Sequence, residues 1–371
     1  MKIVIIGAGF AGIAAARQLS RSKKDLNITL INRYTYTQFR PLFPDIISRS
    51  VAVKYVSYSL NQLAQQLGFN FIQGTAVAVN TDSNSVSMDN SRDISYDFLI
   101  IATGSETPVP GKIKKSGIVN TLDTINDSRN IADTLHSGEY QNYVICGGGY
   151  TGIETASHVC KGLEQYNQKG NVLVVEMAET ILSNLPEWMR VYTMANCERL
   201  GIEIKTNTKI TETENRDIIL TDGTHLTNAL LIWSTGLNAV IPCIEPAPTL
   251  GVRNRIKVNN DLRVYDNVFA AGDCACTSTD NGCFRMAVQS SISSGICAAD
   301  NLLALIGGYK THPYYFTDPG FIVPMPNWYS CGIMFGRQLR GRVATFLHYI
   351  MSSYRSYGFK NKIMVMVNEF F

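Results

Sequence analysis

The stretches GAGFAG (residues 7–12) and GGGYTG (residues 147–152) share one spacing of glycines, and each stands between an apolar run and a helix-forming segment. In the first, Gly7 permits a tight turn, Gly9 lets the backbone approach a pyrophosphate, and Gly12 allows the helix to pack closely on the strand. The start of the helix adds free N–H groups and a positive dipole end for the phosphate. The order strand, turn, helix therefore predicts a Rossmann-like dinucleotide-binding unit at the beginning of the chain.

The second strand of this unit is predicted at ITLIN (28–32). An acid that binds the ribose is expected about 20 residues after the last glycine of the frame. The residue found there is Asn32. Its amide oxygen can accept a hydrogen bond from a ribose hydroxyl, although without the help of a charge.

Three blocks of sequence recur in the same order. Residues 7–19 resemble 147–159, residues 28–33 resemble 172–177, and residues 97–104 resemble 229–236. This pattern indicates an internal duplication of the dinucleotide-binding unit. A chain with two such units holds two dinucleotides, and the chemical use of the pairing is to bring a flavin and a nicotinamide together for hydride transfer.

In the second unit the strand VLVVE (172–176) ends in Glu176, an acid suited to a ribose 2′-hydroxyl. Met177 and Ala178 follow it, so no Arg or Lys is present to bind a 2′-phosphate. We therefore predict NADH rather than NADPH.

Composition excludes several other classes. The chain has 371 residues, 45% of them hydrophobic and 17% charged, which favours a folded α/β protein. A net charge of +3 argues against a nucleic-acid partner. We see no signal peptide and no run of roughly 18 apolar residues that would span a membrane. The nine cysteines favour reduced thiols and a cytoplasmic location.

The duplicated blocks resemble the flavoprotein family with two dinucleotide-binding domains, the pyridine nucleotide-disulfide oxidoreductase-like proteins. Further motifs of this family are ATG (102–104), STG (234–236) and VFAAGDC (268–274). The resemblance implies that the first glycine frame binds FAD, the second binds NADH, and Asp273 contacts the ribityl chain of the flavin. The cofactor-binding residues implied in this way are Gly7, Gly9, Phe10, Ala11, Gly12, Asn32, Arg33, Arg40, Pro41, Val77, Ala102, Thr103, Gly104, Gly147, Gly149, Tyr150, Thr151, Gly152, Glu176, Gly236, Gly272 and Asp273.

We accordingly predict an α/β protein with two Rossmann-like domains, of the glutathione reductase-like type. Residues 1–112 and 245–310 are expected to form the FAD-binding domain, and residues 113–244 an NADH-binding domain inserted into it. Residues 311–371 are expected to form a C-terminal segment for membrane docking or dimerisation.

Within the family the chain is most similar to the type II NADH dehydrogenases. The segment YTYTQFRPLFPDIISRS (34–50) lacks the cysteine pair of the disulfide reductases and contains FRPLF, which implies Pro41 near the flavin ring. Alternatively, Pro41 only holds the preceding backbone extended. Glu154 matches a Glu near the nicotinamide, although the helix dipole alone also favours an acid there. With Gln289, it is our candidate for a catalytic polar group.

The resemblance implies a membrane quinone as electron acceptor, but one motif departs from it. Anchored on the following GICAADNL, the quinone-facing helix reads VQSSISS (288–294). Gln289 keeps the first glutamine of the family pattern. Ser293 and Ser294 stand in place of the two glutamines that contact the quinone, and a serine hydroxyl has a much shorter reach.

Two alternative functions stay open. Cys274, Cys276, Cys283 and Cys331 would suit a thiol-handling enzyme similar to sulfide:quinone oxidoreductases, although these generally lack an intact second glycine frame. The other alternative is a non-catalytic flavin redox sensor. We predict no metal site, because the first three cysteines have no fourth ligand close by and the five histidines are scattered.

The tail (336–371) has apolar residues at helical spacing, with basic residues around them. Such a segment is suited to lie in a membrane interface, here on the inner face of the cell membrane. Alternatively, it packs on the FAD domain or forms a homodimer. The apolar stripe consists of Leu339, Val343, Phe346, Leu347, Ile350, Met351 and Tyr354, and its basic neighbours are Arg337, Arg340, Arg342, Arg355, Lys360 and Lys362.

Overall fold

The computed structural model describes residues 1–114, 117–279 and 282–370. The chain divides into two compact units, each assembled from three separate segments. Unit 1 consists of residues 1–37, 58–106 and 237–318, and unit 2 of residues 38–57, 107–236 and 319–371. Strands β3 (Tyr36–Gln38) and β4 (Ser57–Ser59) lie where the chain passes between the units. Among the described residues, no helix is long and apolar enough to cross a membrane.

Unit 1 is built on a six-stranded sheet that is parallel except at β22. Its strands, in spatial order, are β22 (Arg263–Tyr265), β23 (Val268–Ala270), β9 (Phe98–Ile101), β1 (Lys2–Ile6), β2 (Asn27–Asn32) and β5 (Asn70–Gln73). Strand β1 is the apolar run KIVII, and its last four residues are buried. A fully buried central strand of a parallel sheet needs such a run, since helices or other layers cover both faces.

Smaller elements complete unit 1. A second sheet contains β20 (Cys243–Glu245), β6 (Ala76–Asn80), β7 (Ser85–Met88) and β8 (Asp93–Ser95), and a third contains β21 (Ile256–Val258), β24 (Ala275–Thr279) and β25 (Gly282–Cys283). The pair β10 (Ser105–Glu106) and β19 (Asn238–Ala239) is antiparallel. The helices are α1 (Phe10–Ser20), α3 (Leu60–Leu67) and α8 (Val288–Ile306).

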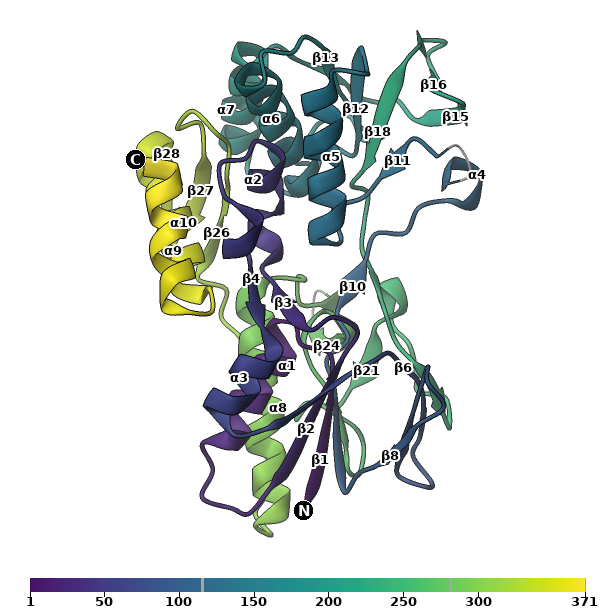
Figure 1. Cartoon of the computed structure of the whole chain (residues 1–371), viewed down its shortest axis with the longest axis vertical. Helices are drawn as coiled ribbons and strands as arrows, with labels where there is room; N and C mark the ends of the chain where they lie inside the picture. The colour runs from purple at the N-terminus through teal and green to yellow at the C-terminus, as the bar shows by residue number, and fades with distance from the viewer. Residues whose placement is uncertain (115–116, 280–281, 371) are drawn as a thin grey trace. The chain divides into compact units, whose positions relative to one another are not determined.

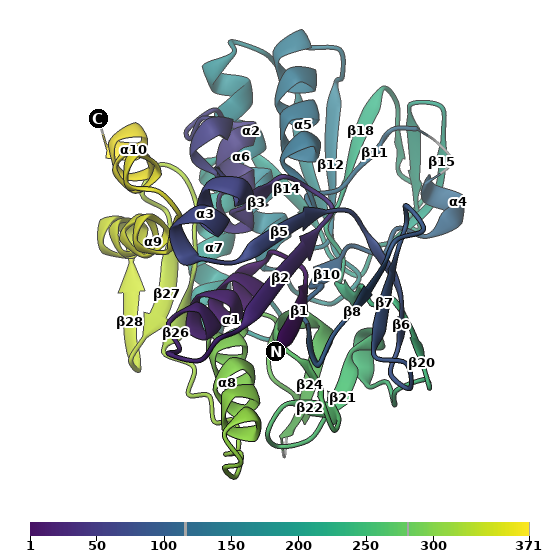
Figure 2. The same ribbon diagram turned by 60° about the horizontal axis from the view of Figure 1, so that its bottom comes forward.

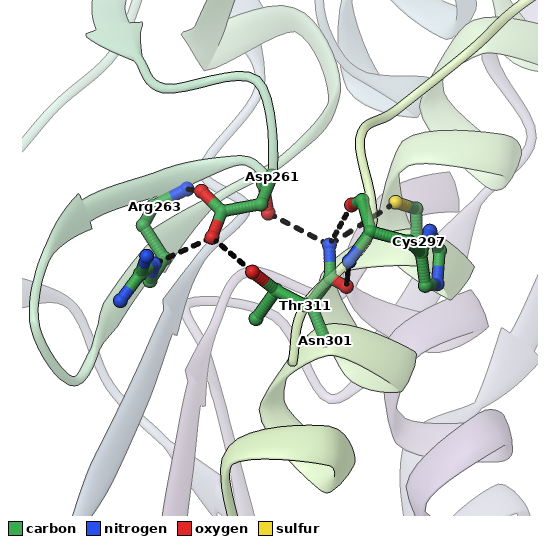
Figure 3. Close-up of polar contacts among 6 residues, drawn as sticks. Asp261, Arg263, Cys297, Asn301 and Thr311 are labelled. Atoms are coloured by element: carbon green, nitrogen blue, oxygen red, sulfur yellow. Dashed lines mark hydrogen bonds and ion pairs between the residues drawn. The ribbon is translucent and has the colours of Figure 1, made fainter. Parts of the chain in front are cut away.

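Helices α1 and α8 pack closely against one another (Figure 2). Gly295 makes this approach feasible, because a Cβ atom at that position would lie 2.2 Å from the carbonyl oxygen of Ala11. The other end of α8 is fixed by a polar cluster (Figure 3). There the buried side chain of Asn301 donates to the carbonyl oxygens of Asp261 and His312, each at 2.9 Å, and accepts from the His312 N–H at 2.9 Å.

Unit 2 repeats the architecture with a five-stranded parallel sheet. Its order is β11 (Val119–Asn120), β18 (Ala229–Trp233), β12 (Asn142–Cys146), β13 (Asn171–Val175) and β14 (Ile202–Lys205). Helices α5 (Ile125–Ser137), α6 (Tyr150–Gln165) and α7 (Glu187–Arg199) belong to this unit, and α6 packs on the sheet and on α5. Helix α5 begins at a capping box, in which Thr124 and Asp127 each accept a hydrogen bond from the other's backbone N–H.

The remaining elements of unit 2 flank this sheet. They are α2 (Phe43–Ile47), α4 (Gly111–Lys114), the strands β15 (Ile210–Glu214), β16 (Asp217–Leu220) and β17 (His225–Leu226), and the C-terminal elements β26 (Gly320–Val323), β27 (Cys331–Met334), β28 (Arg337–Arg340), α9 (Gly341–Arg355) and α10 (Phe359–Phe370). Helices α9 and α10 lie side by side (Figure 1). Unit 2 thus includes two segments that the sequence analysis did not assign to the NADH-binding domain. They are residues 38–57 and the C-terminal segment.

Candidate dinucleotide-binding sites

The first glycine frame connects β1 to α1. Gly7 has φ +102°, and a Cβ atom there would lie 2.3 Å from the carbonyl oxygen of Ala102. A Cβ atom at Gly12 would lie 1.9 Å from the carbonyl oxygen of Gly7. Gly9 is the N-cap of α1, and a Cβ atom there would have no other atom within 4 Å. The frame is therefore closed at the first and third glycine and open at the second, where a pyrophosphate needs access.

The second frame, between β12 and α6, has the same geometry. Gly147 has φ +112°, and a Cβ atom at Gly152 would lie 1.8 Å from the carbonyl oxygen of Gly147. Gly149 is the N-cap of α6 and faces open space. The duplication predicted from sequence is thus present in the backbone conformation of both loops.

The residues that end the second strand of each unit also correspond. Asn32 accepts a hydrogen bond from the Ala8 N–H at 3.1 Å, and Glu176 accepts one from the Gly148 N–H at 2.6 Å. Glu176 also accepts from the Ala178 N–H at 2.8 Å. Both side chains therefore hold the glycine loop of their own unit. Met177 beside Glu176 is exposed, and no cation from this turn is present for a 2′-phosphate.

Asp273 follows Gly272 at the end of the flavin motif and is held from two sides. Its carboxylate accepts from the Ser105 hydroxyl at 2.9 Å and from the Ser291 hydroxyl at 3.2 Å. Ser294 accepts from the Gly272 N–H at 2.9 Å and donates to the carbonyl oxygen of Ser291. Ser294, which stands where the family pattern has a quinone-contacting glutamine, is buried and hydrogen-bonded to the flavin motif.

The other predicted residues lie in both units. Phe10 and Ala11 begin α1, Arg33 pairs with Glu106 at 2.7 Å, and Val77 is exposed on β6. Ala102, Thr103 and Gly104 form the turn after β9, and the carbonyl oxygen of Gly104 accepts from the Val240 N–H at 3.1 Å. Gln289 is half-buried in the first turn of α8. In unit 2, Tyr150 and Thr151 begin α6, and Gly236 has φ +67° in the turn after β18.

Arg40 and Pro41 were predicted near the flavin, and they form a short 3₁₀ turn, Arg40–Leu42, in unit 2. Burial raises the pKa of the Asp123 carboxyl in the same unit, and the charge of Arg40 opposes part of this rise. This turn leads into α2.

Glu154 lies in α6 with 5% of its surface exposed, and its Oε1 atom makes no hydrogen bond. Burial raises the pKa of this carboxyl well above its usual range, and the charge of Asp45 in α2 raises it further. Asp45 is also buried, and it accepts a hydrogen bond from the Tyr349 hydroxyl of α9 at 2.6 Å. Sequence analysis missed Asp45 and Tyr349, which lie 109 and 195 positions from Glu154 along the chain, respectively.

 Asp45 and Tyr349 are 304 positions apart in the sequence, so only the fold brings them together.

One pair of cysteines is joined by a disulfide, and the seven others are free thiols. Cys276 and Cys283 form a disulfide between β24 and β25, so the expectation of reduced thiols is wrong for these two residues. The buried thiol of Cys274 donates to the carbonyl oxygens of Ile101 and Ala271, each at 3.3 Å, and burial raises its pKa. Burial also raises the pKa of Cys331. A thiol with a raised pKa is a poor nucleophile, which argues against thiol chemistry at these two positions.

Comparison with known proteins agrees with this geometry. The model of the pyridine nucleotide-disulphide oxidoreductase family matches residues 1–299. The chain belongs to this family. It is therefore a pyridine-nucleotide oxidoreductase with two Rossmann-type domains, and both the fold class and the resemblance seen in the sequence are confirmed.

Individual relatives are similar over almost their whole length. A type II NADH:quinone oxidoreductase of Haemophilus influenzae is 24% identical, and the match covers 95% of this chain and 92% of the relative. A protein of the same name from Staphylococcus aureus is 23% identical, with 95% and 94% covered. Among solved structures, NDH2 from Plasmodium falciparum in complex with NADH superposes with a TM-score of 0.87 at 16% identity, covering 99% of this chain and 97% of that one.

Proposed function

We propose that this protein is an FAD-dependent NADH:quinone oxidoreductase. The observation that carries the proposal is the presence of two glycine frames of one geometry in a single chain, the first without and the second with an acid at the end of its second strand. The relatives named as type II NADH:quinone oxidoreductases support the acceptor.

Unit 1 has the features that FAD requires. The open N-cap at Gly9 and the N-terminus of α1 would receive the pyrophosphate, and Asn32 would accept a hydrogen bond from the adenosine ribose. Asp273 would meet the ribityl chain, for which Ser105 and Ser291 hold its carboxylate in place. When bound, FAD supplies the hydride-accepting ring, and the protein supplies binding, orientation and electrostatics.

Unit 2 has the features that NADH requires. Gly149 and the N-terminus of α6 would receive its pyrophosphate, and Glu176 would accept hydrogen bonds from the ribose hydroxyls. Glu154 follows in the next turn of α6 and is assigned to the nicotinamide end. Gln289 is assigned to the flavin ring and the acceptor, and Arg40 and Pro41 to the edge of the flavin.

The half-reactions can be tested separately. Anaerobic addition of NADH to the FAD-loaded protein should bleach the flavin absorbance, and a short-chain quinone should then restore it. A flavin that stays oxidised with NADH would reject the dehydrogenase. A flavin that is reduced by NADH but is not reoxidised by quinone would reject the acceptor only.

We further propose that the protein attaches to the inner face of the cell membrane through α9 and α10. The buried residues of α9 are small or polar, whereas Val343, Phe346, Ile350 and Tyr354 are 57%, 47%, 37% and 78% exposed. Leu347 and Met351 are half-buried, and Leu339 belongs to β28. Phe359 and Ile363 of α10 add exposed apolar surface.

Basic residues adjoin this apolar surface, as interfacial helices require. Arg337, Arg340, Arg342 and Lys360 are exposed, and Arg342 lies over the ring of Trp328 at 5.5 Å. Each basic residue near an anionic surface contributes about 1 kcal/mol to binding. An amphipathic helix normally buries its apolar side in the protein, so the reverse arrangement of α9 favours an external apolar partner.

Vesicle flotation tests the attachment. The protein should float with anionic vesicles at low salt, and the double variant Phe346→Ser/Ile350→Ser should float poorly. Val252→Ser, which removes an exposed apolar side chain of unit 1, is the matched control. Wild-type protein that stays in the soluble fraction at low salt would contradict membrane attachment, and a concentration-dependent dimer in the same sample would assign the apolar surface to a homodimer.

A further inference from the structure

Unit 2 contains two buried carboxyl groups in different surroundings. Glu154 has an oxygen without a hydrogen bond, and burial is the main reason that its pKa is raised. An ionised carboxylate in such a place is costly, so the group keeps a proton to a higher pH. The charge of Asp45 acts in the same direction.

Tyr349 distinguishes the two acids. Its hydroxyl donates to the Oδ1 atom of Asp45 at 2.6 Å, and a donated hydrogen bond stabilises the ionised form of a carboxyl. Two close carboxyl groups titrate as a pair and do not ionise together readily. The hydrogen bond from Tyr349 stabilises the ionised form of Asp45 and so favours Glu154 as the carrier of a proton that the pair shares.

The other titratable groups around the pair come from several elements. One turn further along α6, His158 is buried and its Nδ1 atom lies 2.8 Å from the Ser48 hydroxyl. Helix α9 contributes His348, and burial lowers the pKa of both histidines, so they are neutral at neutral pH. The charge of Lys161 in α6 further lowers the pKa of His158, and that of Arg355 in α9 further lowers the pKa of His348. In α5, the charge of Asp133 acts to raise the pKa of Tyr166 at the end of α6. Among these groups, Asp45 is the one whose charge bears on Glu154.

We propose that Glu154 holds a proton while the nicotinamide is reduced and releases it when NAD⁺ forms, with Asp45 and Tyr349 as positioning residues that set this release. The inference rests on the proposed function, which places Glu154 near the nicotinamide. Oxidation gives the nicotinamide ring a positive charge, and a positive charge nearby favours the ionised carboxylate. By linkage, a ligand that favours the ionised form expels the proton.

The proton balance of the proposed reaction is consistent with this role. The overall reaction, NADH + H⁺ + quinone → NAD⁺ + quinol, consumes one proton. Glu154 would release a proton as the hydride leaves NADH and recover one from water as NAD⁺ dissociates. The residue itself is unchanged over the cycle, so no additional reactant is needed.

Calorimetry of NAD⁺ binding to the oxidised, FAD-loaded protein measures this release directly. Titrations in two buffers with different ionisation enthalpies give the number of protons released. We expect NAD⁺ to release up to one proton near neutral pH and to bind more tightly as the pH rises. ADP-ribose is the matched ligand, since it lacks the nicotinamide ring, and it should release none.

Variants assign the proton to its residue. Glu154→Gln should abolish the release, while Glu164→Gln, at an exposed position of the same helix, should preserve it. Asp45→Asn removes the repelling charge, so the pH profile of proton release should move to lower pH. Tyr349→Phe should move the acidic limb of this profile to higher pH, because Asp45 then binds a proton more readily.

The outcomes separate this inference from the proposed function. Equal proton release by the wild type and Glu154→Gln, or none by the wild type, would overturn the inference even if NADH and quinone turn over. Release without any electron transfer to quinone would leave the inference standing and reject the acceptor. If Asp45→Asn does not fold, the Glu154→Gln and Tyr349→Phe profiles still decide.

Discussion

The side-chain amide of Asn301 donates to the carbonyl oxygen of Asp261 at 2.9 Å and thereby joins α8 to the loop between β21 and β22 (Figure 3). The carboxylate of Asp261 accepts in turn from Arg263 Nε at 2.6 Å and from the Thr311 hydroxyl at 2.8 Å. This cluster holds the segment that follows α8 against the rest of unit 1. Every polar group of Asn301 has a partner, although the side chain is fully buried.

Asn301→Asp should destabilise the protein by about 2–4 kcal/mol, because a carboxylate would face two carbonyl oxygens in a buried place. Urea denaturation followed by circular dichroism measures the change. Asn90→Asp, in an exposed turn, is the control and should change stability by less than about 0.5 kcal/mol. Equal stability of both variants would show that the cluster does not fix α8.

The two glycine frames predict separable losses of cofactor. Gly12→Ala should reduce the FAD content of the purified protein, since its Cβ atom would collide with the Gly7 carbonyl oxygen. Gly152→Ala should weaken NADH binding at least tenfold and leave the FAD content unchanged. Flavin absorbance and NADH titration measure the two effects. Gly111→Ala, where nothing lies within 4 Å, should alter neither, and a loss of FAD in Gly152→Ala would contradict the assignment of the units.

Glu176→Ala should raise the KM for NADH by about tenfold, the effect of losing about 1.4 kcal/mol of binding free energy. Two contributions are lost together, the hydrogen bonds to the ribose and the support of the Gly148 N–H. The preference for NADH over NADPH should shrink in the same variant. Steady-state kinetics with both cofactors check this, and a wild-type preference for NADPH would contradict the role of Glu176.

The buried His348 predicts a loss of stability in acid. Burial lowers its pKa to about 4, whereas the unfolded residue has a pKa of about 6.5. The folded state thus binds fewer protons, and the stabilising contribution is present above pH 6.5 and is lost as the pH falls toward 4. The shift corresponds to roughly 3 kcal/mol.

Replacing His348 shows how much of the loss of stability in acid is due to this residue. Since Nε2 of His348 makes no hydrogen bond, His348→Leu removes the proton-binding group without leaving a lost partner. Its free energy of unfolding should fall less than that of the wild type between pH 6.5 and pH 4. His136→Asn, at an exposed position, should follow the wild type. Parallel curves for His348→Leu and the wild type would reject the prediction.

The sequence predicted those features that depend on residues close together in the chain. The glycine frames, Asn32 and Glu176 lie at fixed spacings because a turn and a phosphate impose them. The buried strands were recognisable as apolar runs. Conversely, the sequence identified Ser294 only as a departure from the glutamine of the family pattern, whereas its hydroxyl accepts a hydrogen bond from the Gly272 N–H. A helix motif alone does not say which face of α8 meets the flavin turn.

Contacts between distant segments were not predictable. The residues around Asp45 do not predict its hydrogen bond with Tyr349, because this contact depends on how α2 and α9 pack within unit 2. The Cys276–Cys283 disulfide was missed for the opposite reason, because composition suggested reduced thiols throughout. For α9 the apolar stripe was recognised, but its exposure follows from Thr345, His348 and Tyr349 filling the buried side.

The division of each unit into three chain segments has a consequence for biosynthesis. Strand β9 acquires its neighbour β23 only after residues 102–267 have been made, and α8, which packs on α1, follows later still. At about 5–20 residues per second, the ribosome needs on the order of ten to thirty seconds for that interval. Throughout it, the edge of β9 and the apolar side of α1 have no partner from their own sheet or helix pair. The nascent chain therefore exposes a strand edge and an apolar helix face during this interval, and slow codons for residues 102–267 would lengthen that exposure.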